Sequence, residues 1–184
     1  MMKVLLLHGT GGNSRDQWFP WLKQELEKKE HQVWLPDLPG ADEPDINKYN
    51  PFIIHHCPFK FDSKTTIVGH SSGATAALGL VQTLPSKINK VISVAGFIDD
   101  LDYDPVKKMF KTWKFDWKKI KNRVNKIYAI YSDNDPYVPV WHAEQLHKLI
   151  GAELVLMPGQ KHFSISTYSK YTKFPKIIDL ISRY

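Results

Sequence analysis

Cysteine is almost absent from this chain of 184 residues, since Cys57 is the only one. No disulfide can therefore form within the chain, and we expect it to work in a reducing cytoplasm. Long apolar runs are missing too. The run at 4–7 ends at His8 and is far too short for a secretory leader or a membrane span. Repeats, linkers and low-complexity segments are also lacking, so we expect a single domain over residues 1–184.

The signatures of several ligand classes are missing as well. The glycine-rich segment 8–13 contains neither Gly-x-Gly-x-x-Gly nor a Walker lysine, which argues against a nucleotide. His55, His56 and Cys57 have no second cluster at zinc spacing, so we expect no metal and no other cofactor. The net charge is +6, with much of the excess between Lys107 and Lys126. Because these lysines are dispersed and no nucleic-acid motif accompanies them, a solvated basic face is favoured over a nucleic-acid site.

Strand-like apolar runs alternate with helix-like segments along the chain. Expected strands cover 4–7, 32–35, 65–68, 90–95, 127–131 and 154–157. Expected helices cover about 13–29, 72–84, 138–150 and 173–183, while prolines leave 47–62 undecided. This alternation is typical of an α/β fold in which a mainly parallel sheet of about six strands carries helices on both faces. In such sheets, chemistry gathers beyond the carboxyl ends of the strands.

The sequence Gly-His-Ser-Ser-Gly at 69–73 joins an expected strand to an expected helix. A turn tight enough to expose one hydroxyl crowds its flanks, and glycine two residues to either side relieves that crowding. Ser71 lies midway between the glycines and is the predicted nucleophile, whereas the neighbouring Ser72 is the weaker choice. An ordinary glycine–serine turn is the alternative, but the flanking strand and helix favour a nucleophile elbow.

A serine nucleophile needs a base and an acid that orients it. After an elbow of this kind the chain order is serine, acid, histidine. His162 is the candidate base, because it follows the last expected strand, whereas the other downstream histidines lie in a predicted helix. Asp135, before Pro136, is favoured as the acid because a residue before proline tends to be extended. Asp133 in the same loop is the alternative, and ordinary turn formation is the simpler explanation for both.

Backbone N–H groups must also stabilise the charge that forms on the substrate oxygen. The residue after the nucleophile, Ser72, is the first expected donor. The second is expected from the glycine-rich loop after the first strand, where Thr10 is favoured and Gly11 comes next. Gly11 is also a tentative pocket residue.

The segment 97–124 is an insert in which aromatic residues recur at helical spacing, with Asp116 as a candidate start of a second helix. It precedes the strand that carries the candidate acid. We expect a small cap over the pocket, with Trp113 or Trp117 against the substrate. The alternative is a stripe that packs into the core.

With these residues in place, the chain resembles the small α/β-hydrolases of the retinoblastoma-binding-protein-9-like serine hydrolase family. The resemblance spans essentially the whole chain and rests on motifs at 8–13, 69–74, 112–117, 132–136 and 162–163. It implies a compact α/β-hydrolase fold shortened at the N-terminus, without the first two strands of larger relatives, and esterase-type chemistry without a cofactor. The Leu-x-Cys-x-Glu motif of retinoblastoma-protein ligands is absent, so any protein partner is left open.

These observations predict a serine hydrolase, carboxylesterase-like, that cleaves small to medium acyl esters through an acyl-enzyme. The expected partner is a small acyl substrate rather than a nucleic acid or a membrane. Two alternatives remain: a catalytically silent binding module of the same fold, and a thioesterase or peptidase that uses the same three residues.

Overall fold

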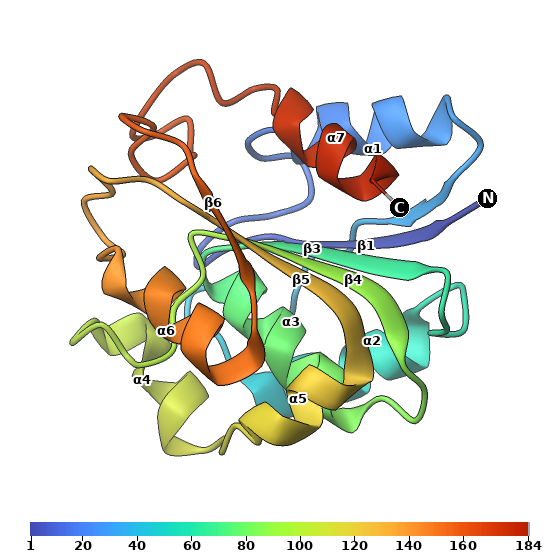
Figure 1. The fold of residues 1–184 in the computed structure, drawn as a ribbon, viewed down its shortest axis with the longest axis horizontal. Helices are drawn as coiled ribbons and strands as arrows, with labels where there is room; N and C mark the ends of the chain where they lie inside the picture. Colours follow the sequence, from blue (N-terminus) through green and yellow to red (C-terminus); the bar gives the residue numbers. More distant parts are fainter. Residues whose placement is uncertain (184) are drawn as a thin grey trace.

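A wholly parallel sheet of six strands, in the order β2-β1-β3-β4-β5-β6, forms the centre of the protein (Figure 1). The structure is a computed structural model that describes residues 1–183. The strands are β1 (Lys3–Leu7), β2 (Gln32–Trp34), β3 (Thr65–His70), β4 (Ile88–Val94), β5 (Val124–Tyr131) and β6 (Glu153–Leu156). The helices are α1 (Phe19–Glu27), α2 (Ile46–His56), α3 (Ser72–Thr83), α4 (Asp104–Lys111), α5 (Trp117–Arg123), α6 (Trp141–Ile150) and α7 (Pro175–Ser182).

Helices cover both faces of the sheet, as the alternating pattern predicted. Figure 1 shows α1 and α7 on one face and the other helices on the opposite face. Each strand contributes side chains to the core on both faces, because successive side chains point to opposite sides. Leu5 and Leu7 of β1 belong to the core under α2–α6, whereas Val4 and Leu6 belong to the core under α1 and α7. The predicted α/β architecture with a six-stranded sheet is therefore confirmed.

The first helix starts later than expected. The side chain of Asp16 accepts hydrogen bonds from the backbone N–H and the side-chain amide of Asn13, both at 2.9 Å, and holds this segment in a turn. Helix α1 begins only at Phe19, with proline in its first turn, where a missing N–H costs nothing. The loop from 8 to 18 is consequently longer than predicted, and it lies at the carboxyl end of β1.

Helix α2 occupies the segment that the prolines left undecided. It starts at a cap in which the Asp45 side chain accepts from Asn47 N, and it continues through Pro51. Tyr49 and Ile53 lie fully buried on its inner face. Packing against α3 therefore overrides the helix-breaking tendency of proline.

The insert 97–124 forms two short helices, α4 and α5. Asp116 caps α5 by accepting from Lys119 N at 2.9 Å, which confirms it as the start of a second helix. Within residues 1–183, no helix combines the length and apolar character needed to cross a membrane.

Candidate active site

Ser71 lies at the sharp turn between β3 and α3. Its backbone has φ 55° and ψ −124°, a region that non-glycine residues rarely occupy, and its N–H donates to Val94 O at 2.8 Å. A Cβ at Gly69 would overlap the backbone of Gly73 and Ala74, and a Cβ at Gly73 would overlap carbonyl groups of β1 and His8. The two glycines therefore serve the close packing of the turn, and the turn presents the serine hydroxyl to the cavity described below.

His162 and Asp135 meet beside this turn, although 27 residues separate them in the chain. His162 Nδ1 lies 3.0 Å from Oδ1 and 2.8 Å from Oδ2 of the carboxylate. Because a carboxylate only accepts, Nδ1 carries a proton, and in the neutral imidazole Nε2 is then the unprotonated nitrogen. Oδ1 also accepts from the N–H groups of Tyr137 and Val138, which fixes the carboxylate in place.

The alternative acid, Asp133, has a different partner. Its Oδ1 accepts from Gly159 N at 2.7 Å, while the neighbouring Asn134 Oδ1 accepts from Lys161 N at 2.8 Å. These contacts tie the loop after β5 to the loop after β6. The structure thus brings Asp135, and not Asp133, to His162.

Two backbone N–H groups near Ser71 remain free. Within residues 1–183, neither Thr10 N nor Ser72 N has a hydrogen-bond acceptor. The Thr10 hydroxyl donates to Ser72 Oγ at 3.0 Å and so holds the loop after β1 against the start of α3. Gly11 N, by contrast, donates to Ala41 O at 2.8 Å. Thr10 N and Ser72 N are therefore without an acceptor, whereas Gly11 N already has one.

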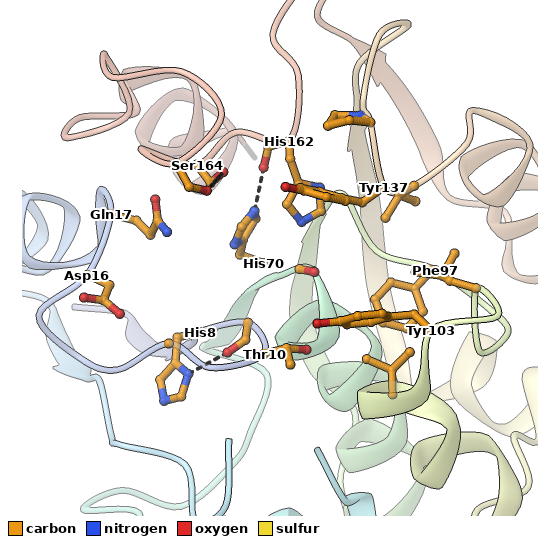
Figure 2. A pocket seen from close by; sticks show the side chains of 18 of the residues that line it. His8, Thr10, Asp16, Gln17, His70, Phe97, Tyr103, Tyr137, His162 and Ser164 are labelled. Atoms are coloured by element: carbon orange, nitrogen blue, oxygen red, sulfur yellow. Dashed lines mark hydrogen bonds between the residues drawn. The ribbon is translucent and has the colours of Figure 1, made fainter. Parts of the chain in front are cut away.

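A cavity of about 500 Å³ lies over Ser71 and His162. Figure 2 shows Asp16, Gln17 and Ser164 along one side and Phe97, Tyr103 and Tyr137 along the other. Leu101, Val106 and Val138 add to the apolar side. The cavity is large enough for a small or medium-sized organic molecule.

A family model described as "Serine hydrolase" matches residues 4–183. The chain belongs to this serine hydrolase family. YdeN of Bacillus subtilis (strain 168) is 26% identical over 99% of this serine hydrolase and 95% of its own length. Serine hydrolase RBBP9 of Rattus norvegicus is 26% identical over 95% of this chain and 94% of its own length. The resemblance inferred from the motifs is confirmed.

Solved structures agree with this assignment. The crystal structure of the B. subtilis ydeN gene product superposes with a TM-score of 0.87 at 25% identity, covering 99% of this serine hydrolase and 97% of the other chain. Polyneuridine aldehyde esterase is only 14% identical, yet its structure gives a TM-score of 0.72 and covers 98% of both chains. At that identity the likeness concerns the fold alone, which is the α/β-hydrolase fold predicted from the sequence.

The three candidate pocket residues of this serine hydrolase lie outside the cavity. Trp113, Trp117 and Gly11 are not among the residues that line the cavity. Trp113 packs against the core under α2–α6, and the Trp117 ring stacks on Phe115 with centroids 5.0 Å apart. Tyr103, from the same insert, lines the cavity instead. Neither tryptophan therefore faces the cavity: Trp113 lies between α4 and α5, Trp117 begins α5, and both pack against the core.

His70, the residue before Ser71, has a structural role that the sequence did not predict. Its Nε2 lies 2.8 Å from the backbone oxygen of His162, and only 4% of the residue is exposed (Figure 2). Burial, reinforced by the nearby His162, lowers the pKa of His70 to about 3. The only available signal was its position in the elbow motif, which gives no hint of a contact with a residue 92 positions away.

His8 is a second buried histidine on the cavity wall. Its Nε2 accepts from Leu38 N at 2.9 Å and its Nδ1 faces Gly9 O at 3.1 Å, a pattern that only neutral imidazole satisfies. Burial lowers the pKa of His8. It therefore supports the loop after β1 as an uncharged group.

Within residues 1–183, no three His, Cys, Asp or Glu side chains are grouped so that they could hold a metal ion.

Proposed function

We propose that this serine hydrolase cleaves small to medium acyl esters in the cytoplasm, through an acyl-enzyme on Ser71. The observation that carries the proposal is the contact of His162 Nδ1 with Asp135 at the cavity over Ser71. With Nδ1 engaged by the carboxylate, Nε2 is the ring nitrogen available to accept the serine proton. The esters remain a proposal, because membership of the family specifies hydrolysis by serine and no particular bond.

The proposed reaction has two halves. His162 Nε2 removes the Ser71 hydroxyl proton as Oγ attacks the ester carbonyl, and the amides of Thr10 and Ser72 bind the oxyanion. The bond to the alcohol then breaks, and Nε2 returns the proton to the leaving oxygen. Water, deprotonated by the same nitrogen, then attacks the acyl-enzyme; the bond to Ser71 Oγ breaks, the acid leaves, and Nε2 returns the proton to Oγ. Asp135 holds the tautomer throughout.

The insert 97–124 has a more limited part in this proposal. Tyr103 and Val106 lie on the cavity wall, so the first half of the insert acts as a small cap against the acyl group. The second half, with Trp113 and Trp117, supports that cap from the core side.

A fluorophosphonate probe tests the nucleophile directly. We expect the wild type to be labelled and Ser71→Ala to be unlabelled and inactive on p-nitrophenyl esters, since no other hydroxyl lies at the elbow apex. Ser86→Ala, at an exposed serine outside the cavity, is the matched control and keeps both properties. Labelling that survives Ser71→Ala would reject Ser71.

The same experiment separates the alternative functions. A folded wild type that neither reacts with the probe nor cleaves any ester would favour the silent binding module. Probe labelling with turnover only of thioesters or peptides would keep the three residues and replace the substrate.

A further inference from the structure

The two walls of the cavity differ sharply in chemistry. One wall consists of polar side chains from the loop after β1 and from the segment after His162: Asp16, Gln17, Ser164 and Ser166. Gln17 Oε1 accepts from Ile165 N at 2.6 Å, which joins these two segments into one surface. The facing wall is mainly apolar and carries Phe97 and Tyr103, with Asp102 at its rim (Figure 2). A substrate that spans the cavity must therefore have a polar end and an apolar end.

The charge of the cavity is opposite in sign to that of the protein. The chain has a net charge of +6, yet the lining residues include Asp16 and Asp102 and no lysine or arginine. His8 and His70 do not offset these carboxylates, because burial lowers the pKa of both and keeps them neutral. Near neutral pH, the cavity wall is therefore acidic.

Asp16 is the better placed of the two carboxylates. Its Oδ2 accepts two hydrogen bonds from Asn13, whereas its Oδ1 has no hydrogen-bond partner within residues 1–183. Asp102 is exposed at the rim and lies in the field of Lys107, which reduces its effect on a bound molecule. Asp16 is thus a half-buried, oriented carboxylate with one oxygen free.

We propose that this cavity selects esters that combine an apolar group with a cationic group, and that it disfavours esters bearing a carboxylate. The apolar group packs against Phe97 and Tyr103, and the cation lies toward Asp16. The inference rests on the proposed esterase function and specifies its substrate class. A cleft lined by charge of one sign concentrates ligands of the other sign and repels its own, so about a fivefold effect on kcat/KM is expected in each direction.

A matched series of butyryl esters tests this selection. Butyrylcholine supplies a cation, 3,3-dimethylbutyl butyrate is its uncharged isostere, and the butyryl ester of 4-hydroxybutanoate supplies an anion. We expect kcat/KM to fall in that order. Raising the salt from about 20 to about 500 mM screens the carboxylate and should shrink the preference of the wild type for the cation.

The variant Asp16→Asn tests the residue itself. Asparagine keeps the size and an oxygen for the Asn13 contacts but removes the charge, so the ratio of kcat/KM for the cationic over the uncharged ester should drop about fivefold, and its salt dependence should fade. Asp179→Asn, an exposed carboxylate on α7 outside the cavity, is the matched control and leaves the ratio unchanged.

The outcomes are distinct. If the uncharged ester is cleaved and all three esters have equal kcat/KM, the charge selection is overturned while the esterase function stands. A preference for the cation that persists in Asp16→Asn would also overturn the assignment to Asp16. If no ester is cleaved and the fluorophosphonate fails to label Ser71, the proposed function fails, and the substrate class falls with it.

Discussion

At the residue scale, His162 lies between two residues with unusual backbone conformations. Its two neighbours, Lys161 and Phe163, have φ values of 52° and 54°, which are rare for residues with a side chain. Two buried side chains from other parts of the chain bind the carbonyls here. His70 Nε2 donates to His162 O at 2.8 Å, and Trp18 Nε1 donates to Phe163 O at 3.1 Å. Side chains from other parts of the chain thus hold the unfavourable turn that carries His162.

We expect His70→Leu to lower kcat by about ten- to a hundredfold and to change KM much less, because a displaced base mainly affects the chemical step. His70→Gln retains an N–H donor at a similar reach and should recover most of the lost rate. Steady-state kinetics on p-nitrophenyl butyrate measure both constants, and thermal unfolding checks that both variants fold. Equal activity in the two folded variants would show that the hydrogen bond does not position His162.

The residues proposed for catalysis could be inferred from the sequence because chemistry restricts them. In this fold a nucleophilic serine, an acid and a histidine follow three different strands in a fixed chain order, and Ser71, Asp135 and His162 satisfy that order. Their roles remain predictions, although the structure brings Asp135 and His162 together. His70 and Tyr103 could not be inferred in this way, because a contact to a backbone carbonyl or a place on a cavity wall leaves no pattern in the chain.

At the scale of elements, the end of α7 depends on a side chain from the sheet. Lys90 of β4 is buried, and its ammonium group donates to the carbonyls of Leu180, Ile181 and Arg183. These carbonyls at the end of a helix lack partners of their own, and a cation there is favourable. Lys90 therefore joins α7 to the sheet at the end opposite Ser71.

Replacing this lysine should destabilise the fold. We expect Lys90→Met to lower the free energy of unfolding by about 1–3 kcal/mol, because buried carbonyls lose their donor. Urea unfolding measures the change. Lys87→Met, at an exposed lysine of the same loop–strand segment, should alter stability by less than about 0.5 kcal/mol. Equal stability of the two variants would mean that water replaces the Lys90 contacts at no cost.

The elements themselves were predictable to different degrees. All six strands were expected near their observed positions, because short continuous apolar runs such as 4–7 and 65–68 are typical of buried strands. Helix starts were less accurate. Asp16 binds Asn13 and delays α1, and α2 passes through Pro51 because its buried face packs on α3. The late start of α1 and the helix in the undecided segment both arise where side-chain or tertiary contacts outweigh local propensity.

At the scale of the whole molecule, the topology of the sheet brings the candidate site residues to one edge. The strands β3, β5 and β6 run parallel, so the loops that carry Ser71, Asp135 and His162 leave the sheet at the same edge. The sequence predicted this arrangement from the alternation of strands and helices. It could not predict the cavity walls, because segments as distant as 16–17 and 164–166 share one wall.

Three buried histidines from different parts of the chain together make the stability of the whole molecule depend on pH. His8, His70 and His142 are at most 4% exposed, and burial lowers the pKa of each. His142 faces Asp99 at 3.8 Å, which partly opposes the effect of burial. Its Nδ1 nevertheless accepts from Ile98 N at 3.3 Å, so this nitrogen is unprotonated in the fold. Unfolding frees all three side chains to bind protons near their ordinary pKa of about 6.5.

The fold should therefore lose stability as the pH falls. Above about pH 6.5 the histidines are neutral in both states, so their effect on stability is constant there. Below about pH 6.5 the unfolded chain binds protons that the folded chain does not bind, so the free energy of unfolding falls. For His70 this fall continues toward its folded pKa of about 3, at up to about 1.4 kcal/mol per pH unit. Urea unfolding from pH 7.5 to about 5, above the ordinary pKa values of Asp and Glu, should show this slope. His70→Gln should flatten it, whereas His55→Gln, at an exposed histidine, should not. Equal stability of the wild type at pH 7 and pH 5 would show that the buried rings accept protons without unfolding.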